Sequence, residues 1–139
     1  MVVVNAEELI LGRMASEIAK KLLKGEKVEV INAEKTVIIG SKEFVSKKFK
    51  KRLDLQRKGN PHFGPKYPRK PDAIVKRAVR GMLPYRRKRG IDALKKLKVF
   101  IGKPKEITGN VSSIEIARKR EESNFVFLGD ISKALGAKW

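Results

Sequence analysis

Apolar positions in the first forty residues follow two alternating patterns, short continuous runs and a four-residue repeat. Short β-branched or apolar runs at 2–5, 28–32 and 36–39 predict three strands. Between the first two runs, apolar positions 14, 18, 22 and 15, 19, 23 repeat every fourth residue, which predicts a helix that Gly25 ends. A strand, a helix and a strand in this order indicate a βαβ unit with a parallel pair of strands.

A second amphipathic stretch predicts a helix at 42–56, with Ser41 as its N-cap. Val45, Phe49 and Leu53 recur every fourth residue and should face the core, with Phe44 beside them. The opposite side carries lysines, which usually form a solvated face. Because this face leads directly into a basic loop, we favour RNA contact for three of them, Lys47, Lys50 and Lys51.

Residues 58–90 are the stretch around which the rest of the chain is organised, and we call them the basic region. They contain five of the six prolines and eleven Lys/Arg against one acid, Asp72. Proline fixes φ and lacks an N–H donor, so 58–71 is neither a helix nor a central strand. A loop so poor in apolar residues needs an external reason for order, and its cations indicate that this reason is a polyanion. We therefore expect 58–70 to stay mobile in the free protein.

The second half of the basic region predicts a helix with two different sides. Pro71 suits its first turn, Asp72 adds a favourable negative charge there, and Pro84 ends it. One side is apolar: Ile74, Val75, Ala78, Val79 and Met82. The other side is cationic: Lys76, Arg77 and Arg80. A cationic turn at 86–89 follows, then a short helix at 91–97 and a strand at 98–101.

The remaining part of the chain, 103–139, is charge-balanced and is interpreted as a C-terminal extension. We expect a loop at 107–110, a helix at 114–120, an extended segment at 125–127 and a short helix at 129–135. The whole length, 1–139, suits a single domain with a sizeable core.

The net charge of +19 is extreme for a chain of 139 residues, and its position is more informative than its size. Between residues 42 and 105 there are 23 Lys/Arg and four acids, whereas the remainder holds eleven of each. A field concentrated in this way attracts nucleic acid or an anionic membrane surface. No apolar run approaches the roughly 20 residues of a spanning helix. The start lacks the charged region of a signal peptide, so we expect a cytoplasmic protein without a membrane partner.

Residue types that usually carry catalysis or bind metal are scarce. The chain has no cysteine and one histidine, His62, which excludes a Cys-ligated zinc site and a histidine cluster. Gly40-Ser41-Lys42 lacks the upstream glycine of a phosphate-binding loop, because Lys35 stands at that position. We therefore predict no catalytic residue, no metal, no cofactor and no small-molecule substrate.

Arginine and aromatic residues are interleaved in the basic region. Arginine donates bidentate hydrogen bonds to phosphates, and Phe63, Tyr67 and Tyr85 are candidates for stacking on unpaired bases. For Tyr85, packing against the edge of the domain is an equal alternative. His62 is expected to be an exposed loop residue that can stack on a nucleotide. The predicted RNA-binding residues are Arg13, Lys47, Lys50, Lys51, Lys58, His62, Lys66, Tyr67, Arg69, Lys70, Lys76, Arg77, Arg80, Arg86, Arg87, Lys88 and Arg89.

Five segments between residues 11 and 102 carry a resemblance to a known family. They are Leu11-Gly-Arg-Met-Ala-Ser16, Val30-Ile-Asn-Ala-Glu-Lys35, Gly64-Pro65 with Arg69-x-Pro71-Asp72, Arg77-Ala-Val-Arg-Gly-Met-Leu-Pro84, and Leu97-Lys-Val-Phe-Ile-Gly102. Together they resemble the universal L13 (L-thirteen) family of large-subunit ribosomal proteins. The segment Leu128-Gly-Asp-Ile-Ser-Lys-Ala-Leu-Gly136 is similar to the archaeal and eukaryotic branch, and the short length favours the archaeal type. The tail departs from that branch, in which a Trp commonly follows Leu-Gly. Here Ala137 and Lys138 stand between Gly136 and Trp139.

The resemblance implies an α/β fold with three α/β/α layers around a small, mostly parallel four-stranded sheet and long basic loops. It also implies a structural role in the large ribosomal subunit, where the chain binds and stabilises large-subunit rRNA beside neighbouring ribosomal proteins, without catalysis. Two alternatives remain from the residues alone. A DNA- or RNA-binding protein outside the ribosome would share the charge, although no recognition helix is evident. An enzyme of nucleotide metabolism would share the α/β scaffold.

Overall fold

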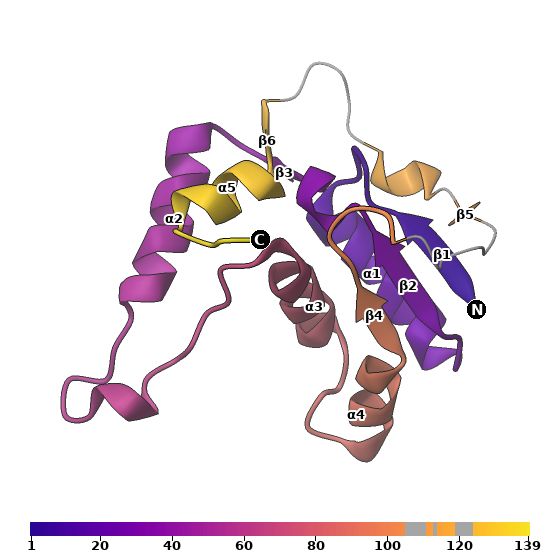
Figure 1. The fold of residues 1–139 in the computed structure, drawn as a ribbon. Coiled ribbons are helices and arrows are strands. Elements are labelled where there is room, and N and C mark those ends of the chain that lie inside the picture. Colours follow the sequence, from indigo (N-terminus) through magenta and orange to yellow (C-terminus); the bar gives the residue numbers. More distant parts are fainter. Residues whose placement is uncertain (105–110, 113, 119–123) are drawn as a thin grey trace.

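The main sheet has four parallel strands in the order β4-β2-β1-β5 (Figure 1). The computed structural model describes the chain except for residues 105–110, 113 and 119–123. The strands are β1 (Val2–Asn5), β2 (Val28–Ile31), β4 (Leu97–Val99) and β5 (Val111–Ser112). Helix α1 (Leu11–Leu23) joins β1 to β2, and Gly25, at a φ of +96°, follows it. The βαβ unit and the mostly parallel α/β sheet are therefore confirmed.

The strand expected at 36–39 lies in a different sheet. It is β3 (Val37–Ile39), and it pairs in the antiparallel direction with β6 (Phe125–Phe127), so that Val37 faces Phe127. The extended segment expected at 125–127 is thus a strand. The fourth strand of the main sheet is β5, which has two residues and was not predicted from the sequence pattern. A run this short carries no periodicity, and the loop expected at 107–110 lies outside the described residues.

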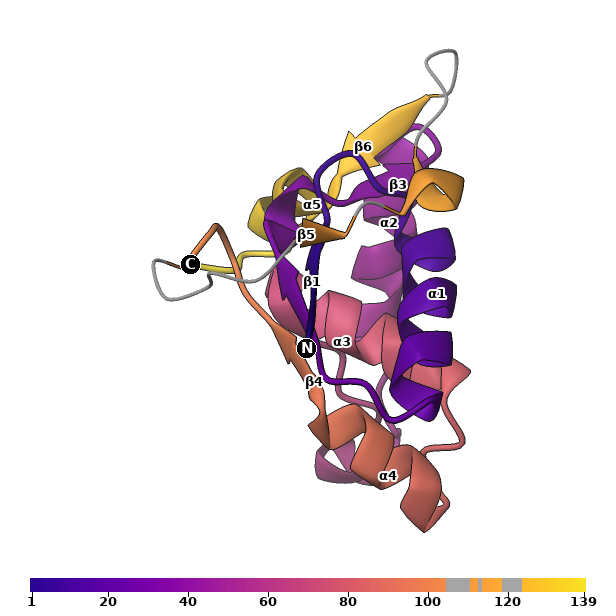
Figure 2. The same ribbon diagram turned by 90° about the vertical axis from the view of Figure 1, so that its right-hand side faces the viewer.

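The main core lies between one face of this sheet and two helices. Val28 and Val30 of β2 pack in one buried cluster with Ile18 of α1 and with Val75 and Val79 of α3 (Pro71–Met82). In Figure 2, α1 and α3 both lie to the same side of β1. Successive residues of a strand point to opposite faces, so Glu29 and Lys98 occupy the other face, with Nζ to Oε1 at 3.7 Å.

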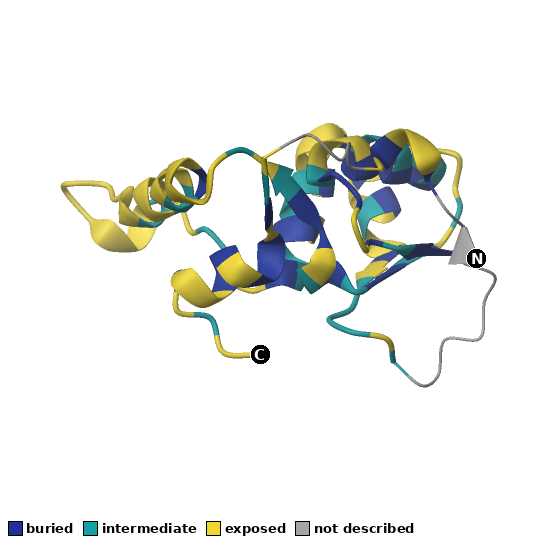
Figure 3. Cartoon of the chain, turned by 90° about the horizontal axis from the view of Figure 1, so that it is seen from above, coloured by how far each residue is buried: buried dark blue, intermediate teal, exposed yellow. Residues whose placement is uncertain are grey.

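A smaller core joins α2 (Lys42–Asp54) and α5 (Leu128–Ala134) to the second sheet. Val45, Val126, Ile131 and Leu135 form its buried centre. The Ser41 hydroxyl accepts a hydrogen bond from the Phe44 amide at 3.4 Å, which confirms the predicted N-cap. Figure 3 shows that most of α2 and the loop after it are exposed, whereas the helices beside the main sheet alternate between buried and exposed positions.

Two side chains expected in the core are exposed instead. Phe44 is 65 % exposed, because α2 contacts the rest of the chain only along the stripe of Val45. Met82 is 45 % exposed in the last turn of α3, and the following residue, Leu83, is buried in its place. Both errors come from helix wheels, which place residues around an axis but do not show where the partner surface stops.

Several element boundaries also differ from expectation. The helix expected at 91–97 is α4 (Lys88–Lys95), so it begins within the predicted cationic turn. Within the described part of 114–120, the expected helix is present only as the short 3-10 helix η3 (Glu115–Ala117). Two other short 3-10 turns are η1 (Ala33–Lys35) and η2 (Pro61–Phe63).

Candidate nucleic-acid interface

The loop from 55 to 70 leaves α2, turns at η2 and returns to α3 (Figure 1). Its outer part, 57–64, closes on itself and is called the loop tip. The Asn60 side-chain oxygen accepts a hydrogen bond from the His62 amide at 3.1 Å. A Cβ added to Gly64 would stand 3.0 Å from the Arg57 backbone nitrogen, so glycine allows the two limbs to meet. The tip therefore has a local structure of its own.

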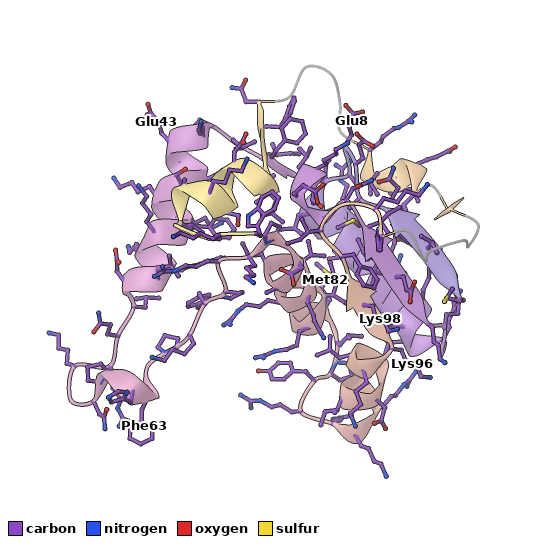
Figure 4. All side chains as sticks on the ribbon, in the orientation of Figure 1. Glu8, Glu43, Phe63, Met82, Lys96 and Lys98 are labelled. Atoms are coloured by element: carbon purple, nitrogen blue, oxygen red, sulfur yellow. The ribbon has the colours of Figure 1, made fainter. Side chains whose placement is uncertain are left out.

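The loop tip presents its aromatic side chains to solvent. Phe63 is 73 % exposed, and Figure 4 shows it at the outer end of the loop, pointing away from the rest of the chain. His62 is exposed as well, as expected. An exposed phenylalanine on a protruding basic loop is suited to stacking on an unpaired base.

The returning part of the loop, 66–69, is tied to α3 and α5. The Arg77 guanidinium lies 4.2 Å from the centroid of the Tyr67 ring and donates from Nη1 to the Lys66 carbonyl at 2.7 Å. The Ser132 hydroxyl of α5 donates to the Arg69 carbonyl at 2.7 Å. The Trp139 indole nitrogen in turn donates to that hydroxyl at 3.0 Å. The structure thus anchors the returning part from two directions.

The three cations of α3 have different surroundings. Lys76 and Arg80 are exposed, whereas Arg77 is half-buried by its contacts with the loop. The Arg80 guanidinium lies 4.8 Å from the centroid of the Tyr85 ring, and that of Arg86 lies 6.0 Å from it. Tyr85 remains 39 % exposed, so it both packs against arginines and presents part of its ring.

Helix α4 begins among cations. Arg87 is its N-cap residue, Lys88 and Arg89 are in its first turn, and that turn has no acid. A helix N-terminus carries a partial positive charge from its free N–H groups, so cations there are unfavourable in the isolated protein. An anion bound at this end would be favoured by the side chains and by the helix together.

The remaining predicted residues are spread over three exposed surfaces. Lys47, Lys50 and Lys51 lie on the outer face of α2, beside one shallow hollow. Lys58, Lys66 and Lys70 are exposed on the loop, and Arg13 is exposed on the first turn of α1. The structure therefore brings together Lys66, Tyr67, Lys76, Arg77 and Arg80 around one hollow, and Tyr85 joins Arg86 to Arg80. The loop tip, the outer face of α2 and the start of α4 lie at separate places (Figure 1), and Arg13 is on α1.

The cations of the basic region have no acidic partners within the described part of the chain. The ion pairs there join other residues, such as Lys20 to Glu17 and Lys35 to Glu7, each at 2.7 Å. In the second pair the hydrogen bond from Lys35 lowers the pKa of Glu7, and the same bond raises the pKa of Lys35. That pair stabilises the contact between the turn after β1 and η1.

Two residues that organise the loop were not predicted. Ser132 of α5 bonds to the Arg69 carbonyl, and Trp139, beyond the helix, bonds to Ser132. The position of α5 beside the loop has no local signal, because 63 residues separate Ser132 from Arg69. The tryptophan at position 139 was the available hint that the tail packs against the domain.

Two other features bear on the function of the described residues, the length of their helices and the grouping of their acidic and histidine side chains. Within them, every helix is too short or too polar to cross a bilayer. Among the same residues, no three His, Cys, Asp or Glu side chains converge to hold a metal ion.

Comparison with known proteins gives one consistent result. The family model for ribosomal protein L13 matches residues 1–106. The chain is 48 % identical to the large ribosomal subunit protein uL13 of Methanosphaera stadtmanae, over 99 % of this chain and 98 % of that one. It is 42 % identical to uL13 of Methanocaldococcus jannaschii over the full length of both, and 42 % identical to uL13 of Haloarcula marismortui over 98 % of this chain and 91 % of that one.

Proposed function

The chain belongs to the ribosomal protein L13 family, in its archaeal type, and from this premise we propose that its basic region and the outer face of α2 bind large-subunit rRNA. As a member of this family it is a structural constituent of the large ribosomal subunit, with ribosomal RNA and neighbouring ribosomal proteins as its partners. It is not an enzyme. The proposal concerns which residues meet the RNA.

One observation supports these residues above all others. Eleven Lys/Arg lie between 58 and 90, and within the described chain no carboxylate forms an ion pair with any of them. Like charges gathered in this way repel one another, and a polyanion removes the repulsion and releases its own counterions. Phosphates of rRNA supply that polyanion.

The proposed contacts fall into two roles. Exposed cations on the loop, on α2 and at the start of α4 bind phosphates, and Phe63 and His62 at the loop tip stack on bases. Arg77 and Tyr67 position the returning part of the loop. In this proposal the chain works as one domain, 1–139. The extension 103–139 holds the RNA-binding loop in place through the bond of Ser132 to Arg69.

A DNA-binding role outside the ribosome is the second candidate. Its basic surface would serve equally for phosphates, but the protruding part of this surface is an irregular loop with an exposed phenylalanine at its tip. Regular duplex grooves are entered by helices or strand pairs, whereas splayed, unpaired bases suit aromatic loop residues. Competition between rRNA and duplex DNA for the same protein tests this candidate.

The experiment uses two charge-matched variants. In the first, Lys47, Lys50 and Lys51 become Gln on the outer face of α2. In the second, Lys21, Lys24 and Lys27 become Gln around the end of α1, outside the proposed surface. Filter binding to a large-subunit rRNA fragment should show weaker binding and a smaller salt slope for the first variant alone, by about one unit of slope for each lost phosphate contact.

Sedimentation of the tagged protein through a sucrose gradient tests whether the α2 lysines are needed for incorporation into large ribosomal subunits. The wild-type protein should travel with large subunits, and the α2 variant should be partly lost from them. Equal rRNA affinity of the two triple variants would remove the α2 face from the proposed surface. Tighter binding to duplex DNA than to rRNA would overturn the assignment to rRNA.

A further inference from the structure

A hollow of about 360 Å³ lies between α2 and α3, under the returning part of the loop. We call it the apolar hollow, because Phe49, Leu53, Ile74, Ala78 and Leu135 form much of its lining. Tyr67 and the guanidiniums of Arg52 and Arg77 stand around it. An apolar cavity with a few convergent polar groups is the usual form of a ligand site.

Gly81 is the part of this lining that the fold does not explain. It lies in the last turns of α3, is exposed, and has none of the positive φ values that favour glycine. A Cβ at this position would meet nothing within 4 Å. Glycine is the poorest helix former after proline, so an alanine here would suit the isolated protein better. Because Gly81 has no side chain, the wall of the apolar hollow leaves room there for another molecule.

A second hollow lies on the other side of the Tyr67–Arg77 pair. We call it the cationic hollow, since Lys66, Lys76 and Arg80 line it. Tyr67, Pro68 and Arg77 line both hollows, so this stacked pair forms the wall between them. An apolar space and a cationic space thus stand side by side, separated by one aromatic ring and one guanidinium.

We propose that these two hollows hold one unstacked nucleotide of an RNA strand, with its base in the apolar hollow and its phosphate in the cationic hollow. The base packs against the Tyr67–Arg77 pair and passes over Gly81, while Lys76 and Arg80 bind the phosphate. This inference rests on the proposed function and adds to it the state of the RNA, which must be single-stranded at this point.

The charge of the two hollows favours a nucleotide over an apolar segment of a neighbouring protein as their occupant. An apolar side chain would fill the apolar hollow equally well. However, it would leave the cations of the adjoining hollow without a counter-charge. A nucleotide satisfies both spaces, because a base and a phosphate are covalently joined at the distance of one sugar. Base stacking on protein side chains also tolerates any sequence, which suits a site without base-specific hydrogen bonds.

The first test is an NMR titration of the ¹⁵N-labelled full chain with two probes, adenosine 5′-monophosphate and inorganic phosphate. The nucleotide should shift the backbone amides of Gly81, Ala78 and Leu53 as well as those of Lys76 and Arg80. Phosphate alone should shift only the last two. If phosphate reproduces every shift, or if neither probe moves Gly81, the base site does not exist.

The second test fills the apolar hollow. Gly81→Leu should melt at or above the wild-type temperature and should lower affinity for the rRNA fragment about tenfold or more, as loss of one stacked base does. Gly12→Leu is the matched control, since Gly12 is also an exposed helical glycine whose Cβ would meet nothing within 4 Å, and it does not line the hollow. That control should bind the rRNA fragment like the wild type.

The outcomes of the second test separate this inference from the proposed function. If Gly81→Leu binds rRNA like the wild type while the α2 lysine variant binds weakly, the nucleotide site is wrong and the rRNA interface stands. If both variants bind like the wild type, both proposals fail. If Gly81→Leu binds rRNA normally but is missing from assembled subunits, the apolar hollow holds a neighbouring protein and not a nucleotide.

Discussion

At the scale of single residues, Gly90 sets the position of the cationic turn before α4. It is buried in the first turn of this helix, and a Cβ there would overlap the Pro84 carbonyl oxygen and stand 2.9 Å from the Tyr85 nitrogen. Both neighbours are backbone atoms, which cannot move aside by changing a rotamer. The close approach of the turn to α4 therefore requires glycine.

We predict that Gly90→Ala lowers stability by about 1–3 kcal/mol, the usual cost of overpacking, and displaces the turn that carries Tyr85 and Arg86. Thermal melting measures the first effect, and weaker rRNA binding reports the second. Gly59→Ala is the control, because a Cβ at Gly59 would meet nothing within 4 Å. If the two alanine variants melt together, the contact at Pro84 is looser than the structure indicates.

Arg77 shows, also at the residue scale, what a sequence pattern can predict about a side chain and what it cannot. Its position in the helix correctly places it away from the buried side, together with Lys76 and Arg80. The pattern contains no information on the loop that crosses above it, so it cannot distinguish an arginine that stacks on Tyr67 from one that faces solvent. A helix wheel gives direction, but the partner in that direction comes from another part of the chain.

At the scale of elements, the loop 55–70 has two parts with different anchorage. The tip holds itself through Asn60 and Gly64, whereas 66–69 is tied to α3 and α5. Because 66–69 is anchored in this way, the expectation that all of 58–70 is mobile in the free protein applies only to the loop tip. We now expect mobility of the tip as a unit and order in the returning part.

We predict that ¹⁵N relaxation of the free protein gives order parameters near 0.85 at Lys66, Tyr67 and Arg69 and values below about 0.6 at the loop tip. Ser132→Ala should lower the order parameters of the returning part, because it removes the hydroxyl that joins Arg69 to Trp139. Ser16→Ala serves as the control, since that hydroxyl bonds only to the Arg13 carbonyl of its own helix. Unchanged dynamics in Ser132→Ala would show that Arg77 alone anchors the loop.

The elements also mark which parts of the fold can be predicted from sequence. The first strand, α1, β2 and the cap of α2 follow from patterns within a dozen residues, and the structure confirms them. The partner of β3 is β6, roughly ninety residues later, so no local pattern distinguishes its sheet from that of β1. The start of α4 at Lys88 was missed because it depends on the close contact of Gly90 with Pro84.

At the scale of the whole molecule, the excess positive charge lies in one block of the chain, and the charges of the rest balance. β1, β2, β5 and α1 belong to the part whose charges balance, while the block 42–105, which carries the excess, contains α2, the loop, α3, α4 and β4. Helix α3 serves both the core and the charged surface, because Val75 and Val79 pack in the main core while Lys76 and Arg80 are exposed. This arrangement was visible in the sequence as a block of charge, but its distribution over α2, the loop, α3 and α4 was not.

We predict that log K for the rRNA fragment falls linearly with log salt. If about half of the eleven cations of the basic region meet phosphates, affinity should drop roughly a thousandfold between about 50 and 200 mM salt. Filter binding over that range measures the slope. A nearly flat response would mean that the basic region does not act through phosphates.

The anchor formed by Ser132 and Trp139 has a consequence for the order of events during synthesis. A chain is made from its N-terminus, so Arg69 is exposed well before the residues that hold it. The 63 residues between Arg69 and Ser132 take roughly 3–13 s at about 5–20 residues per second. Once residue 105 has been added, the nascent chain carries all of its excess charge, still without the contact from Ser132 to the loop. Protection from other polyanions is therefore needed most before synthesis is finished, and less once α5 has folded back.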